Sequence, residues 1–170
     1  MGDPSRVEIL FLDVDGILTD GCIYMGGDGT ELKRFSIRDG LGIKVFMDCG
    51  HKVALISGHA SEATIRRFSR LGVQDIHVGV QEKGRVFDQV LAKHGLTPEQ
   101  AAAMGDDLVD LPMLRRAGFA ATVPDAHPAV REIVDHVTRM PAGLGAVREV
   151  IEIILEARGL QEGVLQRYLA

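Results

Sequence analysis

The sequence predicts an α/β fold of the Rossmann-like, three-layer type, with a mostly parallel central sheet and a β-hairpin inserted after the first strand. Short apolar runs alternate with stretches of helical periodicity, and a Gly-rich segment interrupts this alternation. Strands that alternate with helices form a parallel sheet that helices cover on both faces. At 170 residues, the chain is expected to form one domain over residues 1–170.

The expected strands are short runs that are apolar or rich in β-branched residues. They cover residues 7–12, 52–56, 75–78, 101–104, 119–123 and 136–138. Apolar residues at helical spacing predict helices over residues 43–49, 61–71, 83–94, 108–117 and 145–158. Thr97 and Gln100 stand in the pattern of a capping box around Pro98, which predicts a helical start there.

The segment 21–36 breaks the alternation. Two β-prone stretches, 22–25 and 30–35, flank a Gly-rich turn at 26–29, which is the pattern of a β-hairpin. A strand-to-helix connection normally needs only a few residues, so this segment is an insertion. Because it follows the first strand, we expect a flap that overhangs the carboxyl edge of the sheet, where open parallel sheets bind ligands. The order of the C-terminal tail, 159–170, is left open.

Composition and charge exclude several classes of protein. A hydrophobic fraction of 46% with 25% charged residues is that of a globular chain rather than a disordered one. The formal charge of −5 disfavours a nucleic-acid partner, because phosphate backbones bind basic surfaces. Cys22 and Cys49 are too few for a disulfide framework. The sequence shows neither a secretory signal nor an apolar run of membrane-spanning length, so we expect a cytoplasmic protein without membrane contact.

The strongest motif is Asp13-Val14-Asp15-Gly16, which follows the first predicted strand. A carboxylate at this edge can attack phosphorus and form an aspartyl phosphate, which splits one difficult displacement into two easier steps. A second carboxylate can protonate the leaving oxygen and later deprotonate water. An acidic surface turn is the alternative, but these acids follow a strand that is expected to be buried on both faces.

A second acidic group follows the predicted strand 101–104. Asp106 and Asp110 stand one helical turn apart, and Asp107 lies between them. Together with the first motif, they bring up to five acids to one place, which is unfavourable unless a cation compensates their charge. Oxygen ligands beside a phosphate substrate suit Mg²⁺. A helix dipole explains one or two acids at a helix start, but not three.

Two weaker signals complete this edge. Ser57 and Gly58 follow the strand 52–56, where a hydroxyl and backbone amides at a helix start can hold a phosphate. Lys83 opens the helix 83–94, and its ammonium can neutralise charge on a transferring phosphoryl group. Taken alone, Ser57 is equally well read as a helix cap and Lys83 as a solvated surface charge.

In this order, the Asp-x-Asp-Gly motif, Ser-Gly, the lysine and Gly-Asp-Asp resemble the haloacid dehalogenase superfamily of phosphotransferases. A hairpin in place of a large cap domain resembles the small, capless subclass of that superfamily. Further segments resemble, within that subclass, the phosphatases of 3-deoxy-D-manno-octulosonate 8-phosphate, so that the resemblance covers nearly the whole chain. These segments are 13–21, 38–40, 105–107, 125–128 and 145–150.

The resemblance implies a role for each acid. Asp13 would be the nucleophile and a magnesium ligand, and Asp15 the general acid and base that also offers its backbone carbonyl to the metal. Asp106 would complete the protein ligands of Mg²⁺. Asp107 and Asp110 would orient water or the lysine. The activity implied is hydrolysis of a 3-deoxy-ulosonate sugar phosphate through an aspartyl phosphate, in lipopolysaccharide sugar biosynthesis.

The resemblance also implies the ligand contacts and the assembly. Ser57, Gly58 and Lys83 would hold the phosphoryl oxygens. Members of the family are homotetramers in which the hairpin and a neighbouring subunit's tail close the site. The substrate contacts would be Asp15, Ser36, Ile37, Arg38, Asp39, Gly40, Lys44, His59, Arg67 and Lys83.

Two positions depart from this family. His59 stands where arginine is usual, and Leu144 stands in the segment 142–145 where arginine or glutamate is usual. Arginine pairs bidentately with a carboxylate, whereas histidine offers at most one donor and a pH-dependent charge. The substrate's carboxylate is therefore held differently, or the substrate is a relative such as a nine-carbon ulosonate 9-phosphate.

Two readings without catalysis stay open. A phospho-switch that resembles a receiver domain also clusters acids and a lysine on a parallel sheet. Receivers, however, carry the phosphate-accepting aspartate on a middle strand, whereas the Asp-x-Asp pair here ends the first. A catalytically silent assembly paralogue is the other reading. It is disfavoured because every residue that the chemistry needs is present.

Overall fold

The computed structural model describes residues 2–169, so Met1 and Ala170, the ends of the predicted domain, lie outside the described residues. Its centre is a six-stranded sheet in the order β5-β4-β1-β6-β7-β8, and each neighbouring pair is parallel. The Rossmann-like prediction is confirmed. The strands are β1 (Ile9–Leu12), β4 (Lys52–Ile56), β5 (Asp75–His77), β6 (Ala101–Met104), β7 (Phe119–Thr122) and β8 (His136–Val137).

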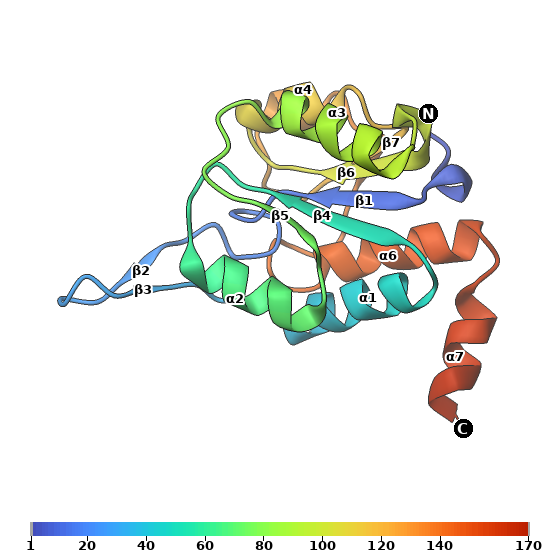
Figure 1. Ribbon diagram of the computed structural model, residues 1–170, viewed down its shortest axis with the longest axis horizontal. Coiled ribbons are helices and arrows are strands. Elements are labelled where there is room, and N and C mark those ends of the chain that lie inside the picture. Colours follow the sequence, from blue (N-terminus) through green and yellow to red (C-terminus); the bar gives the residue numbers. More distant parts are fainter. Residues whose placement is uncertain (1, 170) are drawn as a thin grey trace.

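Helices cover both faces of the sheet (Figure 1). The helices α3 (Lys83–His94) and α4 (Leu111–Leu114) lie on one face. The opposite face carries α1 (Ile37–Asp48), α2 (Glu62–Leu71) and α6 (Ala146–Ala157). Strands β1 and β6 are buried along their whole length, which explains their uninterrupted apolar sequences. The remaining short elements are α5 (Pro128–Arg131), η1 (Pro4–Arg6), η2 (Pro98–Gln100) and η3 (Leu108–Asp110).

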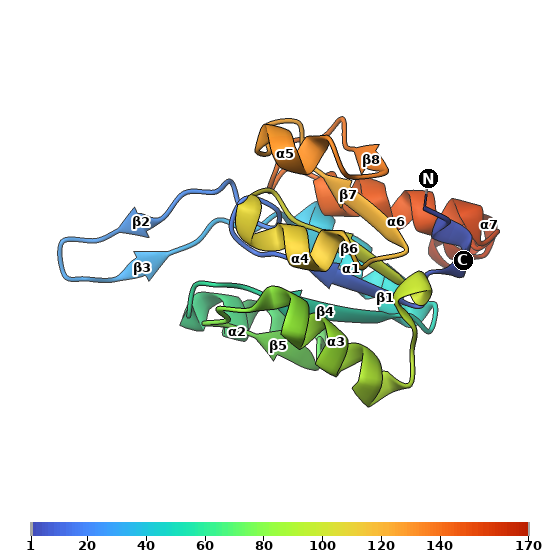
Figure 2. The same cartoon turned by 90° about the horizontal axis from the view of Figure 1, so that it is seen from above.

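The predicted hairpin projects from the body of the molecule (Figures 1 and 2). It consists of β2 (Tyr24–Met25) and β3 (Glu31–Leu32), which pair antiparallel around a turn at 26–30. Gly29 in this turn has φ +84°, a conformation that glycine adopts without strain. The strands are shorter than the predicted 22–25 and 30–35, because the hairpin is largely exposed and has no core to extend its pairing.

Three elements differ from the prediction. α1 begins at Ile37 rather than at 43, because the Ser36 side chain caps its start. The predicted helix 108–117 is reduced to η3 and the single turn α4. The capping box at Thr97 is present but opens only η2 before β6 begins. The tail, whose order was left open, forms a helix, α7 (Gln161–Leu169). No helix within residues 2–169 has the length and apolar character needed to cross a membrane.

Candidate active site

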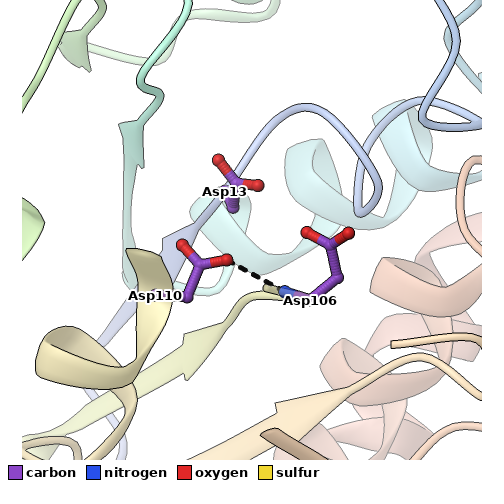
Figure 3. A group of neighbouring side chains, drawn as sticks. All are labelled: Asp13, Asp106 and Asp110. Atoms are coloured by element: carbon purple, nitrogen blue, oxygen red, sulfur yellow. Dashed lines mark hydrogen bonds between the residues drawn. The ribbon is translucent and has the colours of Figure 1, made fainter. Parts of the chain in front are cut away.

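Three carboxylates meet at the carboxyl edge of the sheet (Figure 3). Asp13 follows β1, Asp106 follows the neighbouring β6, and Asp110 ends η3. One oxygen of each lies within 4.8 Å of the others. Gly16 permits this approach: its φ is +91°, and a side chain there would collide with the carboxylate of Asp106. The structure thus brings together three of the five acids that the sequence pointed to.

Lys83 connects two of these acids from the first turn of α3. Its Nζ lies 2.6 Å from Oδ1 of Asp13 and 2.6 Å from Oδ1 of Asp110. The other oxygen of Asp110 accepts hydrogen bonds from the backbone N–H groups of Asp106 at 3.0 Å and Asp107 at 3.2 Å. Asp110 is fully buried and engaged on both oxygens, so it orients the lysine and the turn at 105–107. Asp107 is exposed and caps η3 through the N–H of Leu108 at 2.7 Å.

The electrostatics of the cluster indicate a cation site. Burial raises the pKa of the Asp13 carboxyl to about 6, and Asp110 adds to this against the opposing Lys83. Burial, then the charge of Asp13, raises the pKa of Asp106 to about 8. Burial lowers the pKa of Lys83, but the carboxylates of Asp13 and Asp110 outweigh it and raise that pKa overall. A divalent cation beside Asp13 and Asp106 would favour both ionised carboxylates, and this oxygen-only donor set suits Mg²⁺.

Asp15, the second acid of the first motif, is held by a residue that the sequence did not single out. Lys33, which follows β3, places its Nζ 2.6 Å from Oδ1 and 2.8 Å from Oδ2 of Asp15. The Lys33 side chain is fully buried, whereas that of Asp15 is 29% exposed. In the sequence, this lysine stands in a polar hairpin beside Arg34, where a solvated surface charge is the ordinary interpretation.

Ser57 and Gly58 lie at the same edge, after β4. Strand β4 pairs in parallel with β1 in the register Leu12↔Leu55, so the residues that follow the two strands lie at the same edge of the sheet. Ser57 is buried, and its Oγ accepts a hydrogen bond from the N–H of His59 at 3.2 Å. Gly58 is exposed. A buried hydroxyl beside an exposed glycine backbone suits a phosphate-binding loop.

His59 is tied to the hairpin. Its Nε2 lies 2.8 Å from Oε2 of Glu31, and the hydroxyl of Ser61 donates to Oε1 of the same glutamate at 2.9 Å. These hydrogen bonds, led by that of His59, lower the pKa of Glu31. No pattern in the sequence points to Glu31, since the contact depends on how the hairpin folds back onto the loop after β4.

Three predicted substrate contacts are engaged within the fold. Ser36 caps α1 by accepting the N–H of Asp39 at 3.3 Å. Asp39 is buried and accepts hydrogen bonds from the N–H groups of Gly145 at 3.1 Å and Arg148 at 2.8 Å. Lys44 is exposed on α1, where it pairs with Asp48 at 2.7 Å. Each of these three side chains therefore has a partner within the fold.

The other predicted contacts lie around the start of α1. Ile37 is 83% exposed. Arg38 lines a surface groove that Leu144 also lines. Arg67, on α2, lies against Gly40, and a side chain at position 40 would collide with the guanidinium of Arg67. Ile37 and Arg38 thus lie in the first turn of α1, and Arg67 lies against it.

The comparisons with known proteins agree with this geometry. Residues 68–151 match the family described as haloacid dehalogenase-like hydrolase. The chain is 41% identical to the 3-deoxy-D-manno-octulosonate 8-phosphate phosphatase KdsC of Escherichia coli (strain B / BL21-DE3), over 94% of this chain and 85% of that protein. It is 40% identical to the phosphatase of the same name from Salmonella typhi, over the same shares.

Solved structures show the same likeness. The 3-deoxy-D-manno-octulosonate 8-phosphate phosphatase of Yersinia pestis matches with a TM-score of 0.93 and 39% identity, covering 95% of this chain and 87% of that one. The Moraxella catarrhalis enzyme, in complex with magnesium ion, phosphate ion and KDO, matches with a TM-score of 0.96 and 36% identity, covering 98% and 95%. The chain belongs to the haloacid dehalogenase-like hydrolases. Within that family it is a phosphatase, of the group that these relatives represent.

Proposed function

We propose that the chain is a Mg²⁺-dependent phosphatase that hydrolyses 3-deoxy-D-manno-octulosonate 8-phosphate through an aspartyl phosphate. The observation that carries this proposal is the placement of Asp13. Its carboxylate is buried at the end of β1, 2.6 Å from Lys83 and beside Asp106. The names of the relatives support the substrate, and the magnesium, phosphate and KDO bound to the Moraxella catarrhalis enzyme support the ligands of this edge.

In the first step, an oxygen of Asp13 attacks phosphorus. The bond from phosphorus to the ester oxygen of the sugar breaks, and that oxygen takes a proton from Asp15. The ammonium of Lys83 reduces the negative charge on the phosphoryl oxygens, which Ser57 and the backbone at Gly58 hold in place.

In the second step, water attacks the phosphorus of the aspartyl phosphate. Asp15 takes the proton of the water, and the bond between phosphorus and the oxygen of Asp13 breaks. Inorganic phosphate leaves, and both carboxylates return to their starting states. One side chain thus gives a proton and then takes one, which its partly exposed position, two residues after the nucleophile, allows.

Magnesium would be held by the carboxylates of Asp13 and Asp106 and by the backbone carbonyl of Asp15. When bound, the ion would stabilise negative charge on the phosphoryl group. Asp110 keeps Lys83 against Asp13 at 2.6 Å from each carboxylate. Asp107 is exposed, and we assign it to orienting water near the ion.

The substrate's sugar would lie between the hairpin and the start of α1, where Arg38 and Arg67 supply positive charge. His59 is already paired with Glu31 through its Nε2, so that atom is occupied whether the substrate is the eight-carbon compound or the alternative, a nine-carbon ulosonate 9-phosphate. The substrate's carboxylate would then meet a histidine whose Nε2 is already bonded to Glu31. We therefore expect Arg38 and Arg67 to bind that carboxylate.

We further propose that residues 1–170 act as one domain and that four copies assemble. The hairpin, 21–36, exposes Tyr24, Met25 and Leu32, which are 46%, 64% and 62% accessible. Such side chains on a projecting hairpin are favourably buried by a second subunit. The exposed Ile37 and Lys44 would then face a neighbour, and the tail, 159–170, would help to close its site. The setting we propose is lipopolysaccharide sugar synthesis in the cytoplasm.

The test is phosphate release from three compounds, with Mg²⁺ and with a chelator. They are 3-deoxy-D-manno-octulosonate 8-phosphate, a nine-carbon ulosonate 9-phosphate and p-nitrophenyl phosphate. We expect metal-dependent turnover of the eight-carbon substrate. Asp13→Asn should abolish it, while Asp88→Asn, an exposed aspartate on α3, should keep it. Turnover of the nine-carbon compound alone would keep the mechanism and make that compound the substrate. No turnover of any of the three would contradict the proposal.

A further inference from the structure

Lys33 makes an unusual contact for a hairpin residue. Its ammonium reaches both oxygens of Asp15, at 2.6 and 2.8 Å, and its side chain is fully buried. A buried ammonium is strongly unfavourable without a partner, so the pair persists unless another anion replaces Asp15. Within residues 2–169, the hydrogen bonds and ion pairs of the Asp15 carboxylate to other side chains all come from Lys33.

The segment that carries Lys33 is fastened on two sides. Glu31 binds His59 at 2.8 Å and Ser61 at 2.9 Å, so it ties β3 to the loop after β4. Asp20, just before the hairpin, accepts a hydrogen bond from the hydroxyl of Tyr24 at 2.7 Å. These contacts fix the base of the hairpin at the carboxyl edge of the sheet, although its tip projects away from the body (Figure 2).

We propose that Lys33 is a positioning residue for the reaction: it holds the Asp15 carboxyl group in the orientation from which Asp15 meets the leaving oxygen. When Asp15 carries the proton, one of the two contacts opens, so that Lys33 stays on one oxygen and the other oxygen donates the proton to the leaving group. The inference rests on the proposed function, in which Asp15 exchanges that proton. Asp15 is partly exposed and lies in a loop, so without this contact its carboxylate samples several rotamers. A displacement of about 1 Å in a reacting group costs on the order of 100-fold in rate.

This role makes a prediction about leaving groups. A sugar alcohol leaves poorly as an alkoxide and needs the proton of Asp15. p-Nitrophenolate leaves readily as the anion and does not. The comparison must use kcat/KM, which covers only the steps up to release of the alcohol. Hydrolysis of the aspartyl phosphate is common to both substrates and can lower kcat for each.

The experiment compares Lys33→Met with the wild-type enzyme on the proposed sugar phosphate and on p-nitrophenyl phosphate. We expect kcat/KM for the sugar phosphate to fall about 10- to 100-fold, and that for p-nitrophenyl phosphate to change less than about 3-fold. Lys33→Arg should restore most of the loss. The matched control is Lys93→Met, which removes a lysine that also contacts an aspartate at 2.6 Å, in the pair Lys93–Asp75. It should leave both values unchanged.

Two outcomes would overturn the inference. An equal loss on both substrates would mean that Lys33 only maintains the fold or the phosphoryl site. No loss on either would mean that Asp15 needs no such support. If Lys33→Met does not fold, Lys33→Gln, which keeps a hydrogen-bond donor, carries the same test.

Asp15→Asn separates this inference from the proposed function. If this variant keeps full kcat/KM on the sugar phosphate, the acid role of Asp15 is wrong and the inference falls with it. If it loses activity while Lys33→Met does not, only the positioning role is refuted. In the double variant that combines Asp15→Asn with Lys33→Met, the second change should not lower kcat/KM for the sugar phosphate further relative to that for p-nitrophenyl phosphate. Both changes affect the same proton transfer.

Discussion

Asp39 provides a sharp test of how the structure assigns roles near the site. The sequence suggested that this residue contacts the substrate. In the structure it is 1% exposed, and its two oxygens accept hydrogen bonds from the N–H groups of Gly145 and Arg148 at the start of α6. We therefore predict that Asp39→Ala destabilises the fold before it affects substrate binding, because it leaves two N–H groups of α6 without their acceptor.

The magnitude follows from these contacts. A hydrogen bond to a charged group stabilises by about 1.5–3 kcal/mol, so two such bonds contribute about 3–6 kcal/mol. Burial raises the pKa of Asp39, which shows that the fold disfavours its charge and places the net loss near the lower figure, at about 3 kcal/mol. For a chain of this length, that loss lowers Tm by about 6–12 °C.

The assay is thermal unfolding followed by circular dichroism, with KM measured on the same preparations. Asp48→Ala is the control, because it removes an exposed pair with Lys44 on α1 and should shift Tm by less than about 2 °C. A wild-type Tm for Asp39→Ala, together with a rise in KM of about tenfold, would contradict this prediction. That result would make Asp39 a substrate contact.

Three further predictions concern the metal, a glycine and a buried histidine. At pH 7 the metal-free carboxyl of Asp106, whose pKa is about 8, holds its proton. Mg²⁺ binding should therefore release about one proton, and the affinity for Mg²⁺ should rise from pH 6 to pH 8. Calorimetry in two buffers of different ionisation enthalpy measures this, and equal heats would contradict it. Gly16→Ala should weaken Mg²⁺ binding at least about tenfold, because the new methyl group meets the Asp106 carboxylate and φ is +91°. An unchanged affinity by titration would oppose this. Burial, with a smaller effect from Arg158, lowers the pKa of His51, which stacks on Phe46 at 4.6 Å. The unfolded chain therefore binds this proton first, and stability should fall as the pH drops below about 6.5. His51→Phe should flatten that decline in denaturant unfolding, and an equal slope in both proteins would refute the assignment.

The fold could be predicted because its signals are local. Strands such as β1 and β6 are apolar along their whole length, since helices cover them on both faces. The positions of Asp13 and Asp106 follow from topology, because residues after neighbouring parallel strands meet at one edge. Lys83 opens α3 where the pattern placed the start of that helix.

What the sequence did not reveal depends on contacts between distant segments. Lys33 meets Asp15 across 18 positions, and Glu31 meets His59 across 28, only after the hairpin folds back. Their own neighbourhoods are those of solvated charges. Asp39 shows a related ambiguity, since an acid at the start of a helix looks the same in sequence whether it faces a ligand or holds another helix.

The central claim is that Asp13 carries the phosphoryl group during turnover. The most direct measurement mixes the Mg²⁺-loaded enzyme with 3-deoxy-D-manno-octulosonate 8-phosphate labelled in its phosphate, quenches in acid within one turnover, and maps the label by mass spectrometry. We predict label on the peptide that contains Asp13, and none with Asp13→Asn. Full turnover without label at Asp13, or with label on another residue, would contradict the account.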